Sequence, residues 1–305
     1  MNNKVVIIGC GNVGMAYAYA LVNQGSRIDE LVLIDINKDR IIGEVMDLNH
    51  SLAYSPIKLK IRVGEYSDCS DARIVVISAG VPQKEGETRM DLINNNSKIF
   101  KDIVTKVAET GFDGIFLVAT NPLDVMTFLT WKYSKFPSNR VIGSGTTLDT
   151  ARLQYLIGNK LEINPKDVNA YVIGEHGDSE FVAWSSATIA QQNIDKFLSP
   201  EEMNEIGEEV KNAAYDIIKR KGATYYGIGT ALVKITKAIL DDEELIFTLS
   251  NYDPENKIYI GTPVVLGKEG VRKRIYIDLN EEETTKMKNC IDVITNAIES
   301  IDEQD

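Results

Sequence analysis

The sequence predicts an α/β protein: a doubly wound parallel sheet followed by a second domain of mixed α+β structure. Two observations lead to this prediction. In the first half of the 305-residue chain, short apolar runs alternate with amphipathic segments, which is typical of parallel strands covered by helices on both faces. In the second half, longer helices and hairpin-like strands replace this alternation. The predicted boundary lies near Gly143, dividing the chain into residues 1–143 and 144–305 with no linker, so the halves should share an interface.

Each strand expected in the first half is a short apolar run. These runs cover residues 4–8, 31–34, 59–63, 73–78, 114–119 and 140–144. Helical spacing of apolar residues predicts helices at 13–24, 41–52 and 91–109. A polar loop at 80–89 leads toward the third helix, and Asn121-Pro122 opens a fourth. Proline is tolerated in a first helical turn because its missing N–H would have no partner there.

The second half is predicted from longer patterns. Strands are expected at residues 170–174, 181–189, 245–249 and 257–260, and helices at 201–219, 224–240 and 279–301. The turn-forming residues at 253–256 predict a hairpin between the last two strands.

Composition excludes several classes of protein. The net charge is −12 with no basic stripe, so a nucleic-acid partner is not expected. No apolar run approaches the roughly 20 residues that span a bilayer, and the chain enters a strand at once, unlike a signal peptide. Cys10, Cys69 and Cys290 are far apart, which predicts neither disulfides nor a cysteine metal site. A cytoplasmic location without metal or membrane is expected.

A glycine turn follows the first strand and precedes the first helix. Gly9, Gly11 and Gly14 form a GxGxxG pattern, in which glycines permit a tight turn and close approach of a pyrophosphate to the helix N-terminus. Asp35 follows Gly14 by 21 residues, after the second strand. A carboxylate there binds ribose hydroxyls and repels a 2′-phosphate. This arrangement predicts a Rossmann domain that binds NAD rather than NADP. The alternative, a glycine-rich turn that binds no ligand, is less favoured because the strand, the helix and Asp35 are all present.

Three further segments carry candidate chemistry. His176 lies between glycines at 174 and 177, and histidine exchanges protons near neutral pH; His50, by contrast, is interpreted as an ordinary core histidine. Asp149 and Arg152 share a helix face, where they could also form a simple ion pair or cap. The polar loop at 83–89 could be a catalytic loop or a plain solvated one.

Five ordered motifs resemble the L-lactate/malate dehydrogenase family, most closely its bacterial L-lactate-specific members. They are GVPQKEGETR at 80–89, ATNPLD at 119–124, LDTAR at 148–152, IGEHGD at 173–178 and KGATYYGI at 221–228. With the glycine turn, the resemblance covers essentially the whole chain. It implies reversible hydride transfer between L-lactate and NAD⁺, giving pyruvate and NADH, and a homotetramer.

The resemblance also implies catalytic roles. His176 would accept the lactate hydroxyl proton as hydride leaves C2, and would return it to the pyruvate carbonyl in the reverse direction. Asp149 would orient the imidazole and stabilise its protonated form. Arg152 would bind the substrate carboxylate bidentately. Arg89 would arrive on a closing loop and polarise the carbonyl.

Other residues are implied to bind substrate or cofactor. Gln83, Asn121, Asp124 and Thr224 would complete the substrate site. The implied cofactor-binding residues are Gly9, Gly11, Val13, Gly14, Asp35, Arg40, Tyr66, Ala79, Gly80, Thr120, Asn121 and Ser144.

Three alternatives remain open. A malate dehydrogenase shares nearly every motif, and Gln83 is the residue that best separates the two activities. A dehydrogenase for bulkier 2-hydroxy acids should carry an apolar residue at that position. A non-catalytic NAD-sensing regulator would need no His176–Asp149 pair and usually has a DNA-binding module, which we do not find in the sequence.

One feature departs from many bacterial relatives. In allosteric members of the family, an arginine two residues after the carboxylate-binding arginine and a histidine seven residues before the catalytic histidine contact fructose 1,6-bisphosphate. Here those positions are Gln154 and Asn169, which are both neutral. The resemblance therefore predicts an enzyme that this sugar bisphosphate does not activate.

Overall fold

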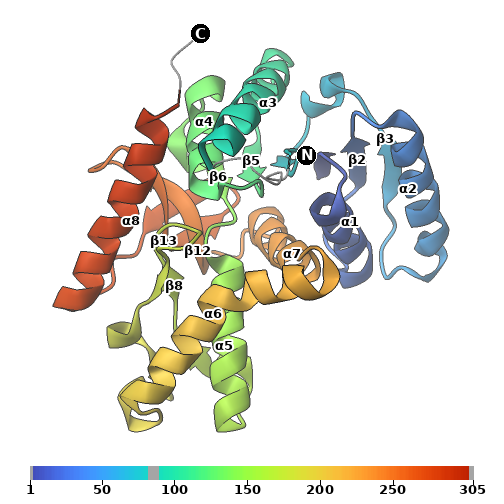
Figure 1. Ribbon diagram of the computed structural model, residues 1–305. Helices are drawn as coiled ribbons and strands as arrows, with labels where there is room; N and C mark the ends of the chain where they lie inside the picture. Colours follow the sequence, from blue (N-terminus) through green and yellow to red (C-terminus); the bar gives the residue numbers. More distant parts are fainter. Residues whose placement is uncertain (1–2, 82–88, 302–305) are drawn as a thin grey trace.

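The computed structural model describes residues 3–81 and 89–301, with side chains described at 3–81 and 92–301 (Figure 1). Its main feature is a nine-stranded sheet in the order β14-β13-β12-β6-β5-β4-β1-β2-β3. The strands from β3 to β6 are parallel, and their order is that of a doubly wound dinucleotide-binding sheet. The predicted fold class is confirmed.

The parallel part of the sheet is built as the alternation of strands and helices predicted. Its strands are β1 (Lys4–Ile8), β2 (Glu30–Ile34), β3 (Lys60–Val63), β4 (Ile74–Ile77), β5 (Ile115–Val118) and β6 (Val141–Gly143). The connecting helices are α1 (Asn12–Gln24), α2 (Lys38–Ser51), α3 (Arg89–Glu109) and α4 (Leu123–Ser134). The strand order reverses between β1 and β4, and this is where ligands bind in such sheets.

Both faces of this sheet are covered, which explains why its strands are almost continuously apolar. In β1, Val5 and Ile7 pack on one side with α1, α2 and α7 (Tyr226–Leu240). Val6 and Ile8 pack on the other side with α3 and α4. Because successive side chains of a strand point to opposite faces, both faces of β1 need apolar residues.

The second half extends the same sheet. It contains α5 (Thr147–Leu161), α6 (Pro200–Lys221), α7, α8 (Glu281–Glu299), β12 (Leu245–Asp253), β13 (Ile258–Gly267) and β14 (Gly270–Arg274). Ser250 of β12 pairs with Gly143 of β6, so the antiparallel hairpin β12–β13 adds directly to the parallel strands. The short strands are β7 (Val168–Asn169), β8 (Val172–Ile173), β9 (Phe181–Val182), β10 (Thr188–Ile189) and β11 (Gln192–Asn193).

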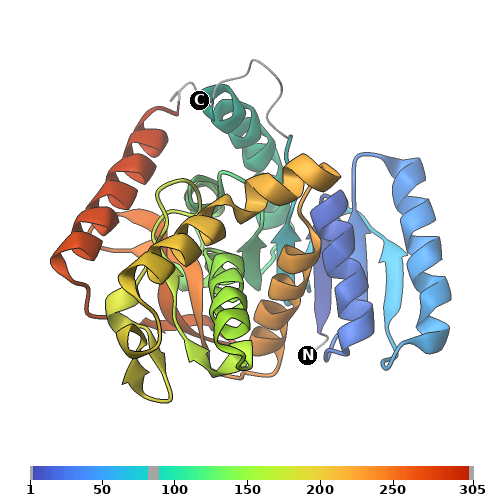
Figure 2. The same cartoon turned by 60° about the horizontal axis from the view of Figure 1, so that its bottom comes forward.

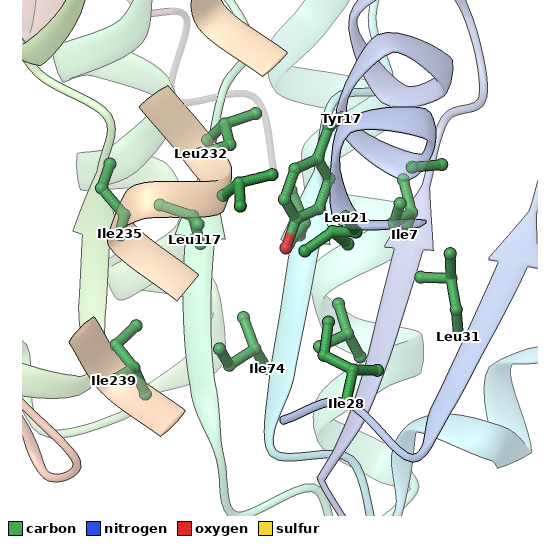
Figure 3. Close-up of a cluster of buried hydrophobic side chains, with 14 of the residues drawn as sticks. Ile7, Tyr17, Leu21, Ile28, Leu31, Ile74, Leu117, Leu232, Ile235 and Ile239 are labelled. Carbon is green, nitrogen blue, oxygen red and sulfur yellow. The ribbon is translucent and has the colours of Figure 1, made fainter. Parts of the chain in front are cut away.

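Helices from the two halves also pack against each other. Figure 2 shows α7 (orange) beside α1 (dark blue), as Figure 1 does. In Figure 3, Tyr17 of α1 lies beside Leu232 of α7, in one cluster of buried side chains that also contains Leu21. The buried Tyr17 hydroxyl lies 2.6 Å from Thr236 Oγ1 of α7. The shared interface expected from the lack of a linker is therefore present.

Several local predictions were wrong. Residues 181–189 do not form one strand: β9 and β10 are separated by a 3₁₀ turn at Trp184–Ser186, where the Ser185 backbone N–H donates to Glu283 of α8 at 2.9 Å. The predicted hairpin strands were too short, and β14 was not predicted. Its three consecutive basic residues at 272–274 carry little apolar signal, but Arg272 and Arg274 are paired with acidic partners.

His50 and the three cysteines lie in different environments. His50 lies exposed in the last turn of α2 and is not a core residue, so that interpretation was wrong. All three cysteines are buried and free, as the absence of a disulfide framework predicted. Among the described residues, no helix has the length and hydropathy needed to cross a bilayer.

Candidate active site

A cleft of about 680 Å³ lies where β1, β2 and β4 end, at the switch point of the sheet. We call it the strand-end cleft. It is lined by Ile8, Gly9, Gly11, Ile34, Asp35, Ile36, Lys38, Glu65, Tyr66, Ser78, Ala79, Gly80, Val81, Lys98, Ile99, Asp102 and Ile103. Ligand sites in doubly wound sheets lie in this position because the strand-to-helix turns on either side diverge there.

The glycine turn forms one wall of the strand-end cleft. A Cβ on Gly9 would lie 2.3 Å from the Ala79 backbone nitrogen, and one on Gly14 would lie 2.2 Å from the Gly9 carbonyl oxygen. These two glycines are therefore required by close packing. A Cβ on Gly11 would meet no protein atom within 4 Å, and Gly11, at the N-cap of α1, makes no side-chain cap bond. The N-terminus of α1 thus presents backbone N–H groups to an anionic ligand.

Asp35 is held in place at the end of β2. Its carboxylate accepts backbone N–H groups from Cys10 at 2.7 Å and Asn37 at 2.8 Å. A carboxylate can accept about four hydrogen bonds, so acceptor capacity remains for a ligand in the cleft. Arg40 pairs with Glu44 at 3.2 Å, and its side chain is half exposed, so its contact with the cofactor stays a prediction.

The other predicted cofactor residues differ in where they lie. Tyr66, Ala79 and Gly80 line the strand-end cleft. Thr120 and Ser144 are buried, and the Thr120 hydroxyl donates to the Ala79 carbonyl oxygen at 2.9 Å, so Thr120 supports the cleft wall from beneath. Val13 packs against the core below the glycine turn.

His176 is held by a loop that follows β8. Gly174 at the start of the loop exchanges two backbone hydrogen bonds of 2.9 Å with Gly261 of β13. It adopts φ +101°, and a Cβ there would lie 2.5 Å from Cys290 Sγ, so only glycine fits. The His176 backbone N–H donates to Asp124 Oδ2 at 2.8 Å. Since Asp124 follows β5 closely, the histidine lies at the same carboxyl edge of the sheet as the strand-end cleft.

Asp149 joins the histidine to an arginine. In the first turn of α5, its Oδ2 lies 2.8 Å from His176 Nδ1, and its Oδ1 accepts from Arg152 Nη1 at 2.6 Å. The Asp149 side chain is 2% exposed, whereas those of Arg152 and His176 are 14% and 25% exposed. The ion pair within α5 exists, but it uses only one carboxylate oxygen. The other oxygen orients the imidazole and leaves Nε2 for a ligand.

The charges of this cluster support one another. Burial disfavours the imidazolium, but the charge and hydrogen bond of Asp149 outweigh it and hold the pKa of His176 well above its ordinary value. Burial likewise opposes ionisation of Asp149, yet His176 and Arg152 lower the pKa of its carboxyl group. The protonated histidine and ionised aspartate are thus the stable pair.

The predicted substrate-binding residues differ in their exposure to solvent. Asn121 is exposed and Thr224 half-buried, each at the start of a segment leading into a helix. Asp124 is buried, and its second oxygen accepts from the Ser250 hydroxyl at 2.5 Å. Both of its oxygens have protein partners, so Asp124 supports the histidine loop; its contribution to the substrate site stays a prediction. Burial raises the pKa of Asp124 to about 6.

Gln83 lies outside the described residues. Arg89 begins α3, and its side chain lies outside the described part of the structure.

Two residues near the site were missed from sequence. Glu180 lies four positions after His176, with its Oε2 3.6 Å from His176 Nδ1; the spacing was visible, but only the fold turns the two side chains together. Asn96 of α3 is fully buried. It accepts from the Val81 backbone N–H at 2.9 Å and donates to the Asn121 carbonyl oxygen at 3.1 Å. No local pattern marks Asn96, because its partners are distant in sequence.

Comparisons with known proteins agree with this geometry. Residues 3–143 match the NAD binding domain of lactate/malate dehydrogenase, and residues 146–304 match the alpha/beta C-terminal domain of the same family. L-lactate dehydrogenase 2 of Bacillus cereus (strain ZK / E33L) is 49% identical over 302 residues, covering 96% of both chains. L-lactate dehydrogenase of Halalkalibacterium halodurans is 49% identical over 296 residues, covering 96% of this chain and 95% of that one.

Solved structures of similar chains share the fold. A lactate dehydrogenase from a Medee basin deep-sea metagenome library gives a TM-score of 0.95 at 49% identity, with 98% of each chain covered. The ligands-bound minor L-lactate dehydrogenase of Enterococcus mundtii gives 0.97 at 40% identity, with 99% of each chain covered. The chain belongs to the lactate/malate dehydrogenase family of NAD-dependent oxidoreductases.

Proposed function

We propose that this chain interconverts L-lactate and pyruvate, with NAD⁺ and NADH as the hydride carriers. The observation that carries the proposal is the buried Asp149 bridging His176 and Arg152 at the carboxyl edge of the sheet. This cluster provides a proton donor and acceptor next to a cation that can bind a carboxylate. Relatives named L-lactate dehydrogenase, 49% identical over nearly the whole chain, support the choice of substrate.

The strand-end cleft fits the cofactor. Bound NAD⁺ supplies the hydride acceptor. The open space at Gly11 lets a pyrophosphate approach the α1 N-terminus, and the positioned Asp35 carboxylate can accept both ribose hydroxyls. The same carboxylate would repel a 2′-phosphate, which favours NAD over NADP. Ile36 is 99% exposed and lines the cleft, so it offers an apolar surface to a base.

The histidine moves the proton. With Asp149 ionised, His176 Nδ1 keeps its hydrogen, and Nε2 exchanges a proton with substrate. In lactate oxidation Nε2 accepts the hydroxyl proton; in pyruvate reduction it donates to the carbonyl oxygen. Arg152 gives one N–H to Asp149 and retains others in a planar fork that suits the substrate carboxylate. Arg89 is proposed to polarise the carbonyl, while Asn121 and Thr224 border the substrate.

Substrate choice is proposed to depend on Gln83, as the motif resemblance implies. A neutral amide can lie over the methyl group of pyruvate, whereas the second carboxylate of oxaloacetate would be buried without a partner there. The test follows NADH absorbance with pyruvate, oxaloacetate and 2-oxoisocaproate in parallel. Pyruvate should give the highest kcat/KM. A preference for oxaloacetate would indicate a malate dehydrogenase, one for 2-oxoisocaproate a bulky-acid dehydrogenase, and no turnover a non-catalytic NAD-binding protein.

We also propose that residues 1–143 bind the dinucleotide and 144–305 the substrate, and that the protein works as a cytoplasmic homotetramer. Two surfaces support self-association. A groove of about 620 Å³ runs between α5, α7 and β12 and includes the exposed Tyr226 and Ile246. Helix α2 exposes Ile42 and Met46 four residues apart, a stripe that apolar burial would cover. Sedimentation equilibrium measures the assembly, and a monomer would contradict this part of the proposal.

A further inference from the structure

Glu180 places a second carboxylate against the ring nitrogen that Asp149 already binds. Its side chain is 6% exposed, and its Oε2 lies 3.6 Å from His176 Nδ1. That oxygen is buried and has no hydrogen-bond partner among the described residues. A buried carboxylate oxygen without a hydrogen bond is costly and calls for a compensating interaction. The nearby imidazolium offers one by charge, since 3.6 Å is too long for a hydrogen bond.

The number of buried charges around the imidazole determines which protonation state of His176 the Glu180 carboxylate favours. Arg152 already pairs with Asp149 at 2.6 Å. When His176 is protonated, the two cations face two carboxylates, Asp149 and Glu180. When His176 is neutral, one buried negative charge remains uncompensated, which is unfavourable in a region of low dielectric.

We infer that Glu180 is a positioning residue that stabilises the imidazolium of His176 and so biases the site toward proton donation, the direction of 2-oxo acid reduction. The inference rests on the proposed role of His176 as proton donor. Glu180 acts only through the ring and not by contact with the substrate.

Other charged groups surround the pair. Asp124 of α4 lies beneath the loop and binds the His176 backbone, and Glu175 accepts from the Ser179 hydroxyl at 2.6 Å. Glu180 also borders a cavity of about 280 Å³. The other charged side chains lining that cavity are Asp178 of the histidine loop, Glu208 and Lys211 of α6, and Lys286 of α8.

The effect of Glu180 should depend on pH. Burial, with the charge of Asp149, raises the pKa of Glu180 to about 7. Below that pH the carboxyl group is neutral and gives the ring little support. As pH rises through about 7, Glu180 ionises and opposes loss of the proton from His176. The imidazolium therefore persists to higher pH than Asp149 alone would allow.

The titration of His176 can be measured directly, because the chain has only two histidines. In protein labelled at histidine Cε1, NMR follows both titrations, and the exposed His50 serves as an internal reference assigned by His50→Gln. In Glu180→Gln, the midpoint of His176 should fall by about one pH unit, since an opposite charge within ~4–6 Å shifts a pKa by this order. Glu208→Gln, an exposed residue on the same cavity, should leave both midpoints unchanged. A His176 midpoint in Glu180→Gln within about 0.3 units of the parent would overturn the inference.

A kinetic measurement accompanies the titration. In Glu180→Gln, the alkaline limb of the pyruvate kcat/KM profile should move to lower pH by the same amount, while the plateau at low pH stays within about threefold of the parent. If Glu180→Gln does not fold, Glu180→Asp replaces it. Its midpoint should lie below the parent because the shortened side chain withdraws its charge, and an unchanged midpoint would refute the inference. The titration needs no substrate, so its failure is distinct from failure of the proposed reaction.

Discussion

Replacing Asp149 with asparagine should separate orientation of the histidine from cofactor binding. The carboxylate is buried and accepts from His176 at 2.8 Å and Arg152 at 2.6 Å. An amide has one acceptor oxygen. If that oxygen stays with Arg152, the NH₂ group faces Nδ1 and favours the tautomer with its hydrogen on Nε2, which cannot accept a proton from lactate.

The expected loss of activity in Asp149→Asn follows from the hydrogen bonds that the substitution removes. A hydrogen bond to a charged group contributes about 1.5–3 kcal/mol, equivalent to roughly 10- to 150-fold in rate. The tautomer change adds to this, and in serine proteases the same substitution lowers kcat by about 10⁴. We expect kcat/KM for pyruvate to fall by about 10²–10⁴ in Asp149→Asn. The pKa of His176 should fall, because the charge of Asp149 raises it, so the alkaline limb of the profile should move to lower pH.

The assay combines steady-state NADH oxidation with fluorescence titration of NADH. NADH affinity should stay within about threefold of the parent, under 1 kcal/mol, because Asp149 does not line the strand-end cleft. Asp195→Asn, an exposed change on the surface, is the matched control and should alter neither value. A loss of activity below about tenfold, or an equal loss of NADH affinity, would refute the proposed orientation of the ring.

Four further predictions follow from the site and its surroundings. His176→Asn should lower turnover by about 10² or more with NADH binding retained; parent-like turnover would exclude His176 as the proton donor. Gln83→Arg should move preference from pyruvate toward oxaloacetate, and a kcat/KM ratio unchanged within about threefold would show that residue 83 does not select substrate. Millimolar fructose 1,6-bisphosphate should not change half-saturating pyruvate, since Gln154 donates to the Val168 carbonyl oxygen at 3.2 Å and Asn169 is exposed and neutral; a marked drop would contradict this. Hydrogen bonds from Arg62 of β3 lower the pKa of Asp68 to about 2, so the stabilisation from ionised Asp68 is present above about pH 4 and is lost as pH falls through about 2. Asp68→Asn should therefore reduce the free energy of unfolding by about 1–2 kcal/mol at pH 7 and by much less near pH 2. Equal losses at both pH values would disprove the linkage.

Elements whose signal is local were predicted well. The apolar runs of β1, β2, β4 and β5 and the glycine turn each depend on residues within a short stretch. Predictions were poorer where distant contacts decide the conformation. The strand expected at 181–189 is interrupted because Ser185 bonds to Glu283, 98 residues away, and the charged β14 is stabilised by partners such as Asp253, 21 residues before Arg274.

The sequence by itself determined the family, the dinucleotide turn and the chemical types at the site, since His176, Asp149 and Arg152 lie in recognisable motifs. Only the tertiary structure decided how they act together. Asp149 is 27 residues from His176 and Asp124 is 52 residues from it, yet both bond to it. The buried Glu180 carboxylate beside the ring is likewise visible only in the fold. Periodicity and turn chemistry specify a local backbone, but the packing of distant elements determines which buried charges meet, and those charges determine the proton affinity of the histidine.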